Sequence, residues 1–296
     1  MSPNSNDGAS YTVRATVGVN LIVSAVLLFS VQDGIAKYLS MLYAPLVIAW
    51  MRFLAQAVLL GAIYGPTLKR ELFRSRVPRL QFYRAICMVG ANLFFLVGLR
   101  FIPLGEATAI FFLAPIFVVL LSRWFLSEKI SAIQLVLIFT SLSGVILIVR
   151  PGTELFTPAA LLPFVSSIFI AIYQMLTRKV MATDSAAAST FLVSVGSLLI
   201  LTVPLPFFWN TLPLIVWVVV FVQAIFAMTG HLLMTHAYRF ASAAVLAPFT
   251  YFQIVFSAIV GWLVFNHVPD LLSSIGIGVV TAGGLIFVQR LRRRGA

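Results

Sequence analysis

The stretch LIVWVVVFVQAIFAMTGHLLMTH, residues 214–236, contains no lysine, arginine, aspartate or glutamate. A helix needs about 20 apolar residues to cross the hydrocarbon core of a bilayer, so this stretch is long enough to span it. Segments of similar character recur along most of the chain, and the short connections between them leave no room for an ordinary soluble domain. The sequence therefore predicts an all-α integral membrane protein.

Ten transmembrane helices are expected, in two sets of five. The first set is 15–39, 44–64, 79–99, 105–124 and 131–149. The second set is 158–177, 188–207, 214–236, 243–265 and 271–289. The chain would thus consist of a disordered cytoplasmic N-terminus, two five-helix repeats and a basic cytoplasmic C-terminus, at residues 1–14, 15–150, 151–289 and 290–296.

The positive charges of the chain are unevenly placed. Charged residues make up only 9% of the sequence, yet the net charge is +12. With the N-terminus in the cytoplasm, most lysines and arginines fall on the cytoplasmic side of the expected spans. They are Arg14, Lys69, Arg70, Arg74, Arg76, Arg79, Arg123, Lys129, Arg178, Lys179, Arg239, Arg290, Arg292, Arg293 and Arg294. The positive-inside rule therefore predicts that both termini are cytoplasmic. Contact with anionic membrane lipid explains such loops without a nucleic-acid partner.

The two sets of helices resemble each other when Arg100 is placed over Arg239, an offset of 139 residues. With that offset Gly144 meets Gly283 without a gap. Because five is an odd number, corresponding helices of the two sets cross the membrane in opposite directions. Inverted repeats of this kind recur in transporters, with the substrate site near the midplane between them. The sequence therefore predicts two inverted-topology five-helix repeats and favours alternating access.

Several ionisable side chains lie inside the expected spans, where each costs at least about 2.5 kcal/mol and marks a candidate functional site. Asp33 and Arg52 lie at similar depths in the first two spans, and Lys37 follows Asp33 by one helical turn. This set is either a structural ion pair or a gating pair that also meets the substrate. Arg84 is close enough to the cytoplasmic end of its span to reach the headgroups. His231 either lines a cavity or makes a structural hydrogen bond.

Uncharged polar residues inside the spans are further candidates for substrate contacts. They are Asn92, Tyr173, Gln174, Tyr251 and Gln253. Pro115, Pro163 and Pro248 also lie within spans, where the missing amide hydrogen bond permits a kink. Kinked helices in both halves suit a protein that moves between two states.

Several kinds of chemistry lack their sequence motifs. The single cysteine, Cys87, excludes an intramolecular disulfide. The chain has no glycine-rich phosphate loop ending in Lys-Ser or Lys-Thr and no His-Glu-x-x-His zinc motif. Three histidines are too few for the two bis-histidine haem sites typical of transmembrane cytochromes. We therefore expect no cofactor, no metal and no enzyme activity, and a small molecule as the partner. The sequence leaves monomer and homodimer equally open.

Local sequence patterns are similar to those of one transporter family. In the second half they are Gly230-His231, Ala237-Tyr238, Ala247-Pro248-Phe249, Tyr251, Gln253, Gly261-Trp262 and Pro269-Asp270. In the first half they are Asp33, Lys37-Tyr38-Leu39, Arg52-Phe53, Pro103-Leu104, Glu106-Ala107, Pro115 and Ser127-Glu128-Lys129. The chain resembles a drug/metabolite transporter of the EamA type. It departs from that pattern at Asn266-His267, where the family often has Gly-Glu.

The resemblance implies a multi-pass protein of the bacterial inner membrane that exports amino acids and related small metabolites. Exporters of aromatic amino acids are the nearest functional analogy, with a central cavity between the two repeats. A multidrug exporter of hydrophobic cations is the alternative, and it would use Asp33 as its binding carboxylate. A membrane-embedded enzyme or a haem protein is the alternative from a different class.

Overall fold

The computed structural model describes residues 5–126, 132–150, 157–237, 239–240, 246 and 249–295. The regular elements within this part are all helices. The first half contains α1 (Ser5–Leu42), α2 (Pro45–Leu68), η1 (Lys69–Phe73), α3 (Pro78–Leu99), α4 (Leu104–Phe111), α5 (Ala114–Leu126) and α6 (Ala132–Val149). The second half contains η2 (Pro158–Ala160), α7 (Leu161–Val180), α8 (Ala186–Thr202), η3 (Leu205–Phe207), α9 (Leu214–Ala237), α11 (Phe252–Phe265) and α12 (Leu271–Gly295).

The first helix starts earlier than the sequence predicts. It begins at Ser5, so residues 5–14, which we expect to be disordered, continue α1 instead. An existing helix extends at the gain of one hydrogen bond for each residue fixed, and residues 5–14 contain no proline that would stop it.

Five of the described helices are long and apolar enough to cross a membrane, and five shorter apolar helices accompany them. The expected span 105–124 is divided into α4 and α5, with a break at Phe112 and Leu113. Pro115 explains the break, because it cannot donate to the carbonyl of Phe111 and its ring crowds that carbonyl. Leu113 donates to Ile110 at 3.1 Å across the break instead of continuing the α-helical pattern.

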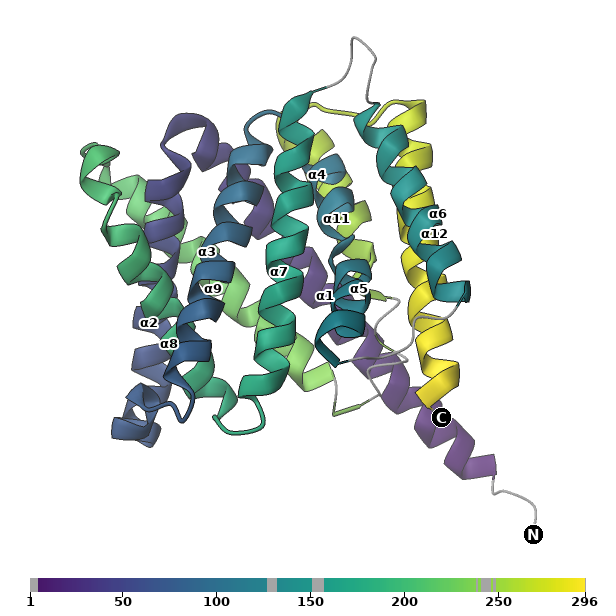
Figure 1. Cartoon of the computed structure of the whole chain (residues 1–296), viewed down its shortest axis with the longest axis horizontal. Helices are drawn as coiled ribbons and strands as arrows, with labels where there is room; N and C mark the ends of the chain where they lie inside the picture. The colour runs from purple at the N-terminus through teal and green to yellow at the C-terminus, as the bar shows by residue number, and fades with distance from the viewer. Residues whose placement is uncertain are drawn as a thin grey trace.

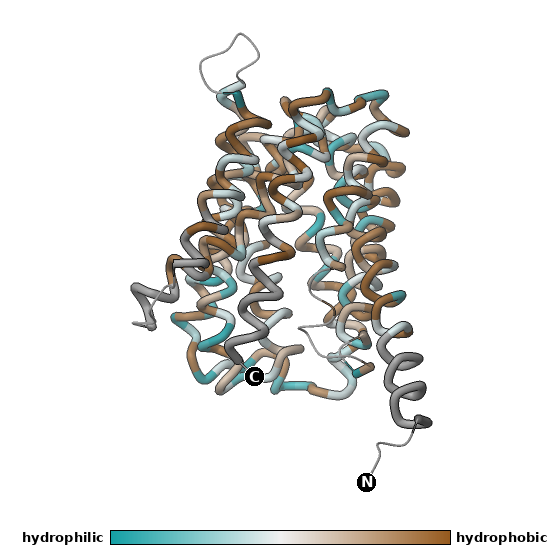
Figure 2. Tube along the Cα trace, turned by 90° about the vertical axis from the view of Figure 1, so that its right-hand side faces the viewer, coloured by the Kyte–Doolittle hydropathy of each residue, from teal (hydrophilic) through white to brown (hydrophobic). Residues whose placement is uncertain are grey.

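The helices stand side by side as one bundle, and both termini lie at the same end of it (Figure 1). The basic segment from η1 to the start of α3 lies at that end too. Hydrophobic residues dominate along the helices, and hydrophilic residues gather at the turns (Figure 2). The apolar core runs through α4, where Leu104, Ala107 and Ile110 are fully buried, and continues to Leu113 in the break that follows. These features agree with a multi-pass membrane protein.

The strongest contacts between the helices of the two halves come in matched sets. α3 packs on α7, and α9 packs on α1. α1 also meets α11, while α7 meets α4 and α5; α3 meets α8, while α9 meets α2. The remaining major contacts pair α2 with α8, α4 with α11 and α6 with α12. If the helices of each half are counted from one to five, with α4 and α5 as one, exchanging the halves leaves this set of contacts unchanged.

Individual close contacts repeat in the same way. A Cβ on Gly90 of α3 would stand 2.8 Å from the Phe169 ring of α7, and a Cβ on Gly230 of α9 would stand 2.6 Å from the Phe29 ring of α1. Both members of the second pair are 140 residues from their counterparts in the first. Only glycine permits either helix to approach so closely.

The α6–α12 contact shows the same correspondence at the offset of 139. A Cβ on Gly144 would meet Val280 at 2.9 Å, and a Cβ on Gly283 would meet Ser141 at 2.5 Å. Exchanging the halves converts one contact into the other.

Candidate functional site

A polar cluster lies where α1 crosses α9 and α11. Both carboxylate oxygens of Asp33 accept hydrogen bonds from amides, Oδ2 from Gln253 Nε2 at 3.2 Å and Oδ1 from Gln32 Nε2 at 3.3 Å. The crossing is held by Ser30, whose Oγ lies 3.1 Å from the carbonyl oxygen of Gln253 and accepts from Ser257 Oγ at 3.2 Å. We call Asp33, Gln32, Gln253 and the two neighbours described next, Arg52 and His231, the central cluster.

Arg52 of α2 interacts with the other members of the central cluster but makes no contact ion pair with Asp33. Its charge acts on Asp33 and on the imidazole of His231. No nitrogen of Arg52 comes within 4.0 Å of the Asp33 carboxylate, the limit for a contact ion pair. The pair expected from the sequence is thus an interaction through space. Part of each side chain remains accessible, although both lie deep within the bundle.

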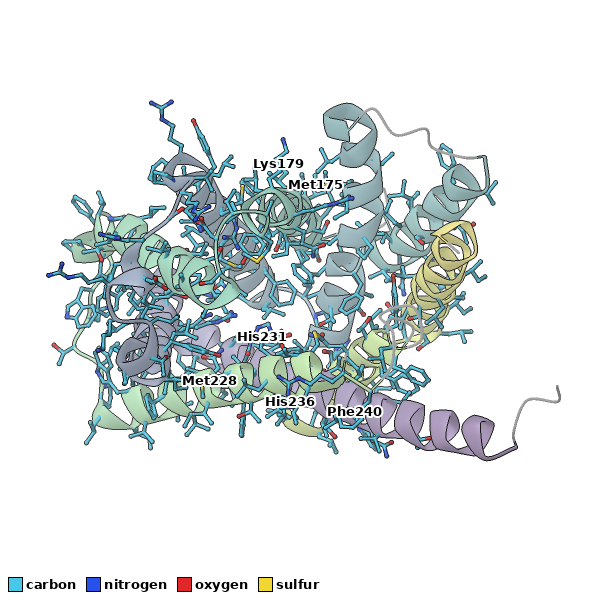
Figure 3. All side chains as sticks on the ribbon, turned by 90° about the horizontal axis from the view of Figure 1, so that it is seen from below. Met175, Lys179, Met228, His231, His236 and Phe240 are labelled. Atoms are coloured by element: carbon cyan, nitrogen blue, oxygen red, sulfur yellow. The ribbon has the colours of Figure 1, made fainter. Side chains whose placement is uncertain are left out.

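His231 brings an aromatic partner to the central cluster. Its ring lies 4.9 Å from that of Phe29 on α1, and its side chain is exposed. Seen from the end that carries the termini, His231 on α9 and Met175 on α7 lie on opposite sides of the middle of the bundle (Figure 3). Tyr251 is buried just before α11, and its ring lies 5.2 Å from that of Phe112, at the break between α4 and α5.

Lys37 does not join Asp33. Its ammonium group donates to the carbonyls of Leu99 at 2.5 Å and Ile102 at 2.6 Å, and it lies 5.4 Å from the centre of the Phe265 ring. A lysine at this place satisfies carbonyls that the end of α3 leaves free. Lys37 therefore fastens α1 to the junction between α3 and α4, at the end opposite the termini.

An ion pair and a histidine–carboxylate contact lie at that same end. Arg150 contacts both carboxylate oxygens of Asp270. The pKa of Asp270 is lowered, chiefly by the hydrogen bond from Arg150 and then by the backbone amide of Ser273. His267 Nε2 stands 3.6 Å from Glu106 Oε1. The first contact joins the end of α6 to the start of α12, and the second places His267, between α11 and α12, beside a carboxylate of α4.

Arg84 is buried, with a relative exposure of 1%, so the expectation that it reaches the headgroups is wrong. Its guanidinium donates to Gln81 Oε1 at 2.6 Å, to Thr177 Oγ1 at 3.0 Å, to Tyr173 OH at 3.1 Å and to Ser189 Oγ. It also lies over the Tyr173 ring, 4.9 Å from its centre. The fork of five donors finds so many acceptors that the side chain stays inside.

The Arg84 contacts continue to the surface through Asp184, which follows α7. Gln81 Nε2 donates to Asp184 Oδ2 at 2.9 Å, the amide of Arg76 donates to Oδ1 at 3.0 Å, and Ser75 Oγ also donates to the carboxylate. Thr183 Oγ1 also donates to Oδ1, at 3.3 Å. Burial opposes ionisation of this carboxylate, but the four hydrogen bonds outweigh it and the pKa of Asp184 is lowered. We call Arg84, its four side-chain partners, Asp184 and Ser75 the Arg84 network.

The other residues predicted from the sequence lie apart from both groups. Asn92 is half-buried and Gln174 is exposed, and neither makes a side-chain hydrogen bond within the described part of the chain. Pro163 is the third residue of α7 and packs against Gly98 of α3. Pro248 lies outside the described residues.

Two glutamines near Asp33 are not among the residues predicted from the sequence. Gln32 neighbours Asp33, and Gln223 is fully buried on α9 and donates to the carbonyl of Gln32 at 3.3 Å. Gln223 Oε1 has no hydrogen-bond partner among the described residues. A polar residue within the apolar run that opens α9 is the signal that could have identified Gln223. The described residues contain no group of three or more metal-ligating side chains, and they offer charges, amides and rings suited to binding a small polar molecule.

One protein-family model matches most of the chain. The model of a family described as "EamA-like transporter family" matches residues 16–150 and 157–289. A pseudopaline exporter CntI of Pseudomonas aeruginosa is 29% identical over 286 residues, 93% of this chain and 97% of that protein. An S-adenosylmethionine uptake transporter of Rickettsia bellii is 23% identical over 276 residues, 92% and 94% of the two chains.

Two further similarities complete this picture. A riboflavin transporter of Brucella anthropi is 27% identical over 199 residues, 65% of this chain and 70% of that protein. A solved crystal structure superposes with a TM-score of 0.64 at 16% identity, covering 94% of this chain and 99% of the other. The superposition shows that the two share a fold.

Proposed function

The chain belongs to the EamA-like transporter family, and from that premise we propose that it exports amino acids and related zwitterionic metabolites. Export would proceed by alternating access, through a central cavity between two inverted repeats in the bacterial inner membrane. Both termini would face the cytoplasm, because the basic segment after α2 lies at their end of the bundle. Aromatic amino acids are the first substrates to test.

One observation carries this proposal: Asp33 and Arg52 present opposite charges deep in the bundle without forming a contact ion pair. Separated charges inside a membrane are costly unless each one contacts a group of opposite charge. A zwitterion does so, with its ammonium group near Asp33 and its carboxylate near Arg52. Guanidinium and carboxylate match each other as a planar, bidentate pair. The exposed ring of His231 and the amide of Gln253 would then contact the rest of the substrate.

Alternating access is supported by the matched helix contacts. Two inverted halves of similar structure supply two arrangements of similar energy, one open to each side of the membrane. The Gly90–Phe169 and Gly230–Phe29 contacts, and the Phe112–Tyr251 pair between equivalent positions, agree with such a relation. The break between α4 and α5 lies at the same level as Tyr251, where motion between the halves would be centred.

The surroundings of Asp33 disfavour the hydrophobic-cation alternative. A carboxylate that binds a cation in an apolar cavity should be free of other partners. Asp33 instead accepts from two amides and feels the charge of Arg52. The names of the relatives are consistent with polar metabolites, since they refer to S-adenosylmethionine, riboflavin and pseudopaline. They include both uptake and export, so the outward direction rests on the resemblance to amino-acid exporters.

The test is counterflow transport by the purified protein in liposomes. The panel holds phenylalanine, its amide, its des-amino analogue and a hydrophobic cation. Arg52→Gln should raise KM for phenylalanine at least about tenfold and leave the amide unaffected, because the amide has no carboxylate. Asp33→Asn should likewise raise KM for phenylalanine and leave KM for the des-amino analogue unchanged, because that analogue has no ammonium group. Truncating Tyr251 or Gln253 to alanine should also weaken transport.

Asp270→Asn serves as the matched control, since it removes a carboxylate far from the central cluster. Transport of the cation alone, abolished by Asp33→Asn, would replace the amino-acid proposal with the multidrug alternative. Unchanged KM values in both central variants would mean that the central cluster does not bind substrate.

A further inference from the structure

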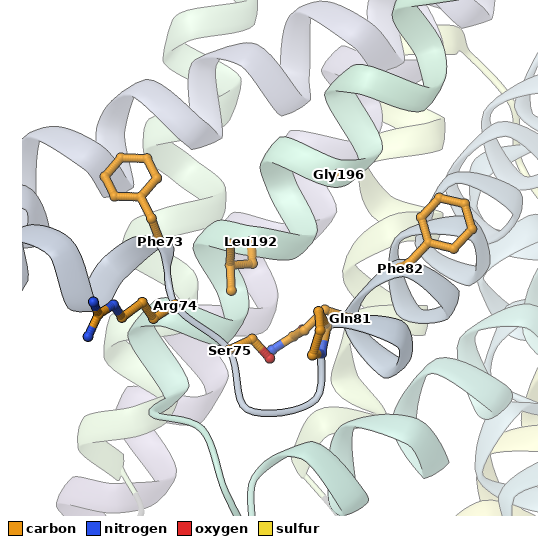
Figure 4. A pocket seen from close by; sticks show the side chains of 8 residues that line it. Phe73, Arg74, Ser75, Gln81, Phe82, Leu192 and Gly196 are labelled. Carbon is orange, nitrogen blue, oxygen red and sulfur yellow. The ribbon is translucent and has the colours of Figure 1, made fainter.

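Two hollows lie side by side on the face of α3 near its first turn. One has a volume of about 430 Å³ and extends between α3 and α8 past Leu192 and Gly196. The other has a volume of about 370 Å³ and adjoins Tyr83. Both hollows are lined by Pro78 and Phe82, so the Phe82 ring stands between them. Figure 4 shows the larger one, with Leu192 at its centre.

The walls of the hollows are mostly apolar, and their aromatic side chains are exposed. The relative exposure is 67% for Phe73 and 56% for both Phe82 and Tyr83. Aromatic side chains are enriched at the interface between membrane and water. Since α3 begins at Pro78 and runs into the membrane from there, the hollows lie at the level where headgroups give way to acyl chains. The part of a bound molecule that lies against the helices should therefore be apolar.

Positive charge borders each hollow. Arg74 lies at the edge of the larger hollow and Arg79 at the edge of the smaller one. Neither side chain has a hydrogen bond or an ion pair within the described residues. In Figure 4 the Arg74 guanidinium points out from the edge of its hollow. The segment 69–79 carries five positive residues against the single acid Glu71, so the occupant should be anionic where it meets these arginines.

We propose that this face binds an anionic phospholipid from the leaflet at the end that carries the termini. Its two acyl chains occupy the hollows on either side of Phe82, and its phosphate lies between Arg74 and Arg79. Charge complementarity and the paired apolar hollows both favour a two-chain lipid over a soluble anion. This site is separate from the central cluster and does not depend on the identity of the transported substrate.

A lipid bound here would lie directly on the Arg84 network. Ser75 and Gln81 line the larger hollow, and both donate to Asp184 between α7 and α8. The lipid would therefore cover the hydrogen bonds that tie α3 to the second half and exclude water from them. We expect it to raise the melting temperature of the protein.

Native mass spectrometry of the full chain in detergent tests the proposal, with phosphatidylglycerol and phosphatidylcholine titrated separately. Each arginine near the membrane surface should contribute about fivefold in affinity for the anionic lipid, so R74Q/R79Q should weaken the first phosphatidylglycerol by about 25-fold. The control R70Q/R76Q removes the same charge from the same segment and should weaken it less than about threefold. All four arginines are exposed, so unchanged melting temperatures without lipid confirm intact folds.

Two results would overturn the proposal. Equal losses in the two double variants would mean diffuse attraction to the basic segment and no defined site. Displacement of phosphatidylglycerol by millimolar glycerol 3-phosphate would mean that the arginines bind a free phosphate and the hollows contribute nothing. Phosphatidylglycerol that resists glycerol 3-phosphate and raises the melting temperature of the wild type, but not of R74Q/R79Q, would support the proposal.

Discussion

The α1–α9 contact and the α3–α7 contact are equivalents in the two halves, yet they hold opposite kinds of polar group. Each is centred on a glycine that receives a phenylalanine ring. One helical turn beyond that phenylalanine stands Asp33 in α1 and Tyr173 in α7. Tyr173 belongs to the saturated Arg84 network, whereas Asp33 belongs to a cluster with an exposed histidine and an arginine out of contact. The same helix packing thus accompanies a fully hydrogen-bonded polar network at one contact and a polar cluster with unused bonding capacity at the other.

The difference indicates how to read a buried charge in a membrane protein. Arg84 has side-chain partners for each of its three guanidinium nitrogens, so it needs no ligand. Asp33 and Arg52 keep bonding capacity that their neighbours leave unused. We infer that the Arg84 network stabilises the fold and that the central cluster binds the substrate.

The largest expected effect is at the Arg84 network. Arg84→Ala removes one donor each from the buried Gln81 and Ser189 and from Thr177 and Tyr173. We expect a loss of about 3–5 kcal/mol in stability. That corresponds to a fall of about 10 °C in the melting temperature in detergent. Arg178→Ala, at an exposed position of α7, should change it by less than about 2 °C. An unaltered melting temperature for Arg84→Ala would remove the distinction between the two regions.

The next effect concerns the central cluster and should appear in transport, not in stability. Asp33→Asn removes a charged acceptor worth about 1.5–3 kcal/mol, so KM for a zwitterionic substrate should rise about 10- to 100-fold. The melting temperature should change by less than about 2 °C, because asparagine can still accept from one amide. If Asp33→Asn instead unfolds the protein at normal KM, the central cluster is as structural as its counterpart.

A smaller effect compares the two glycines directly. Gly90→Ala and Gly230→Ala each push a methyl group into a phenylalanine ring, which should cost about 1 kcal/mol because the ring can shift. Both variants should melt a few degrees lower. Only Gly230→Ala should also change the transport rate, because it displaces Phe29 beside His231. Equal transport by the two variants would argue against a special role for the α1–α9 contact.

The smallest effect is the response of the Arg84 network to acid. Hydrogen bonds lower the pKa of Asp184 below its ordinary value despite burial. Its contribution to stability is therefore complete above the unfolded pKa of about 4 and is lost as pH falls through the lowered native value. Thermal melting between pH 3 and 7 should show this loss in the wild type. In Asp184→Asn that part of the pH dependence should disappear, and its persistence would assign it to another carboxylate.

The sequence alone predicted the membrane class and most helix positions, because apolar segments of the right length have few other uses. It also indicated Pro115 as a candidate kink within one span, and the division between α4 and α5 lies close to this proline. The N-terminal boundary of α1 was wrong because polar residues can prolong a helix that apolar ones have started. Proximity between distant helices has no signal in one sequence.

The site shows the same limit. Asp33, Arg52 and Gln253 stood out because charged and amide groups are rare at membrane depth. Arg84 is buried because hydrogen-bond acceptors from three helices converge on it, and the spacing of residues in the sequence does not reveal this. These acceptors belong to Gln81, Thr177, Tyr173 and Ser189. Lys37 likewise found carbonyl groups, which every residue possesses, and no pattern singles out Leu99 and Ile102.

The gap between Arg52 and Asp33 has an electrical consequence. The two residues belong to different helices, α2 and α1, so their charges need not move together when the halves rearrange. Carrying one charge through a quarter of a 100 mV membrane potential is worth about 0.6 kcal/mol, or nearly threefold in a rate. A zwitterion contributes no net charge of its own. Any voltage dependence of its transport would therefore measure the displacement of the protein's own charges, Arg52 foremost among them.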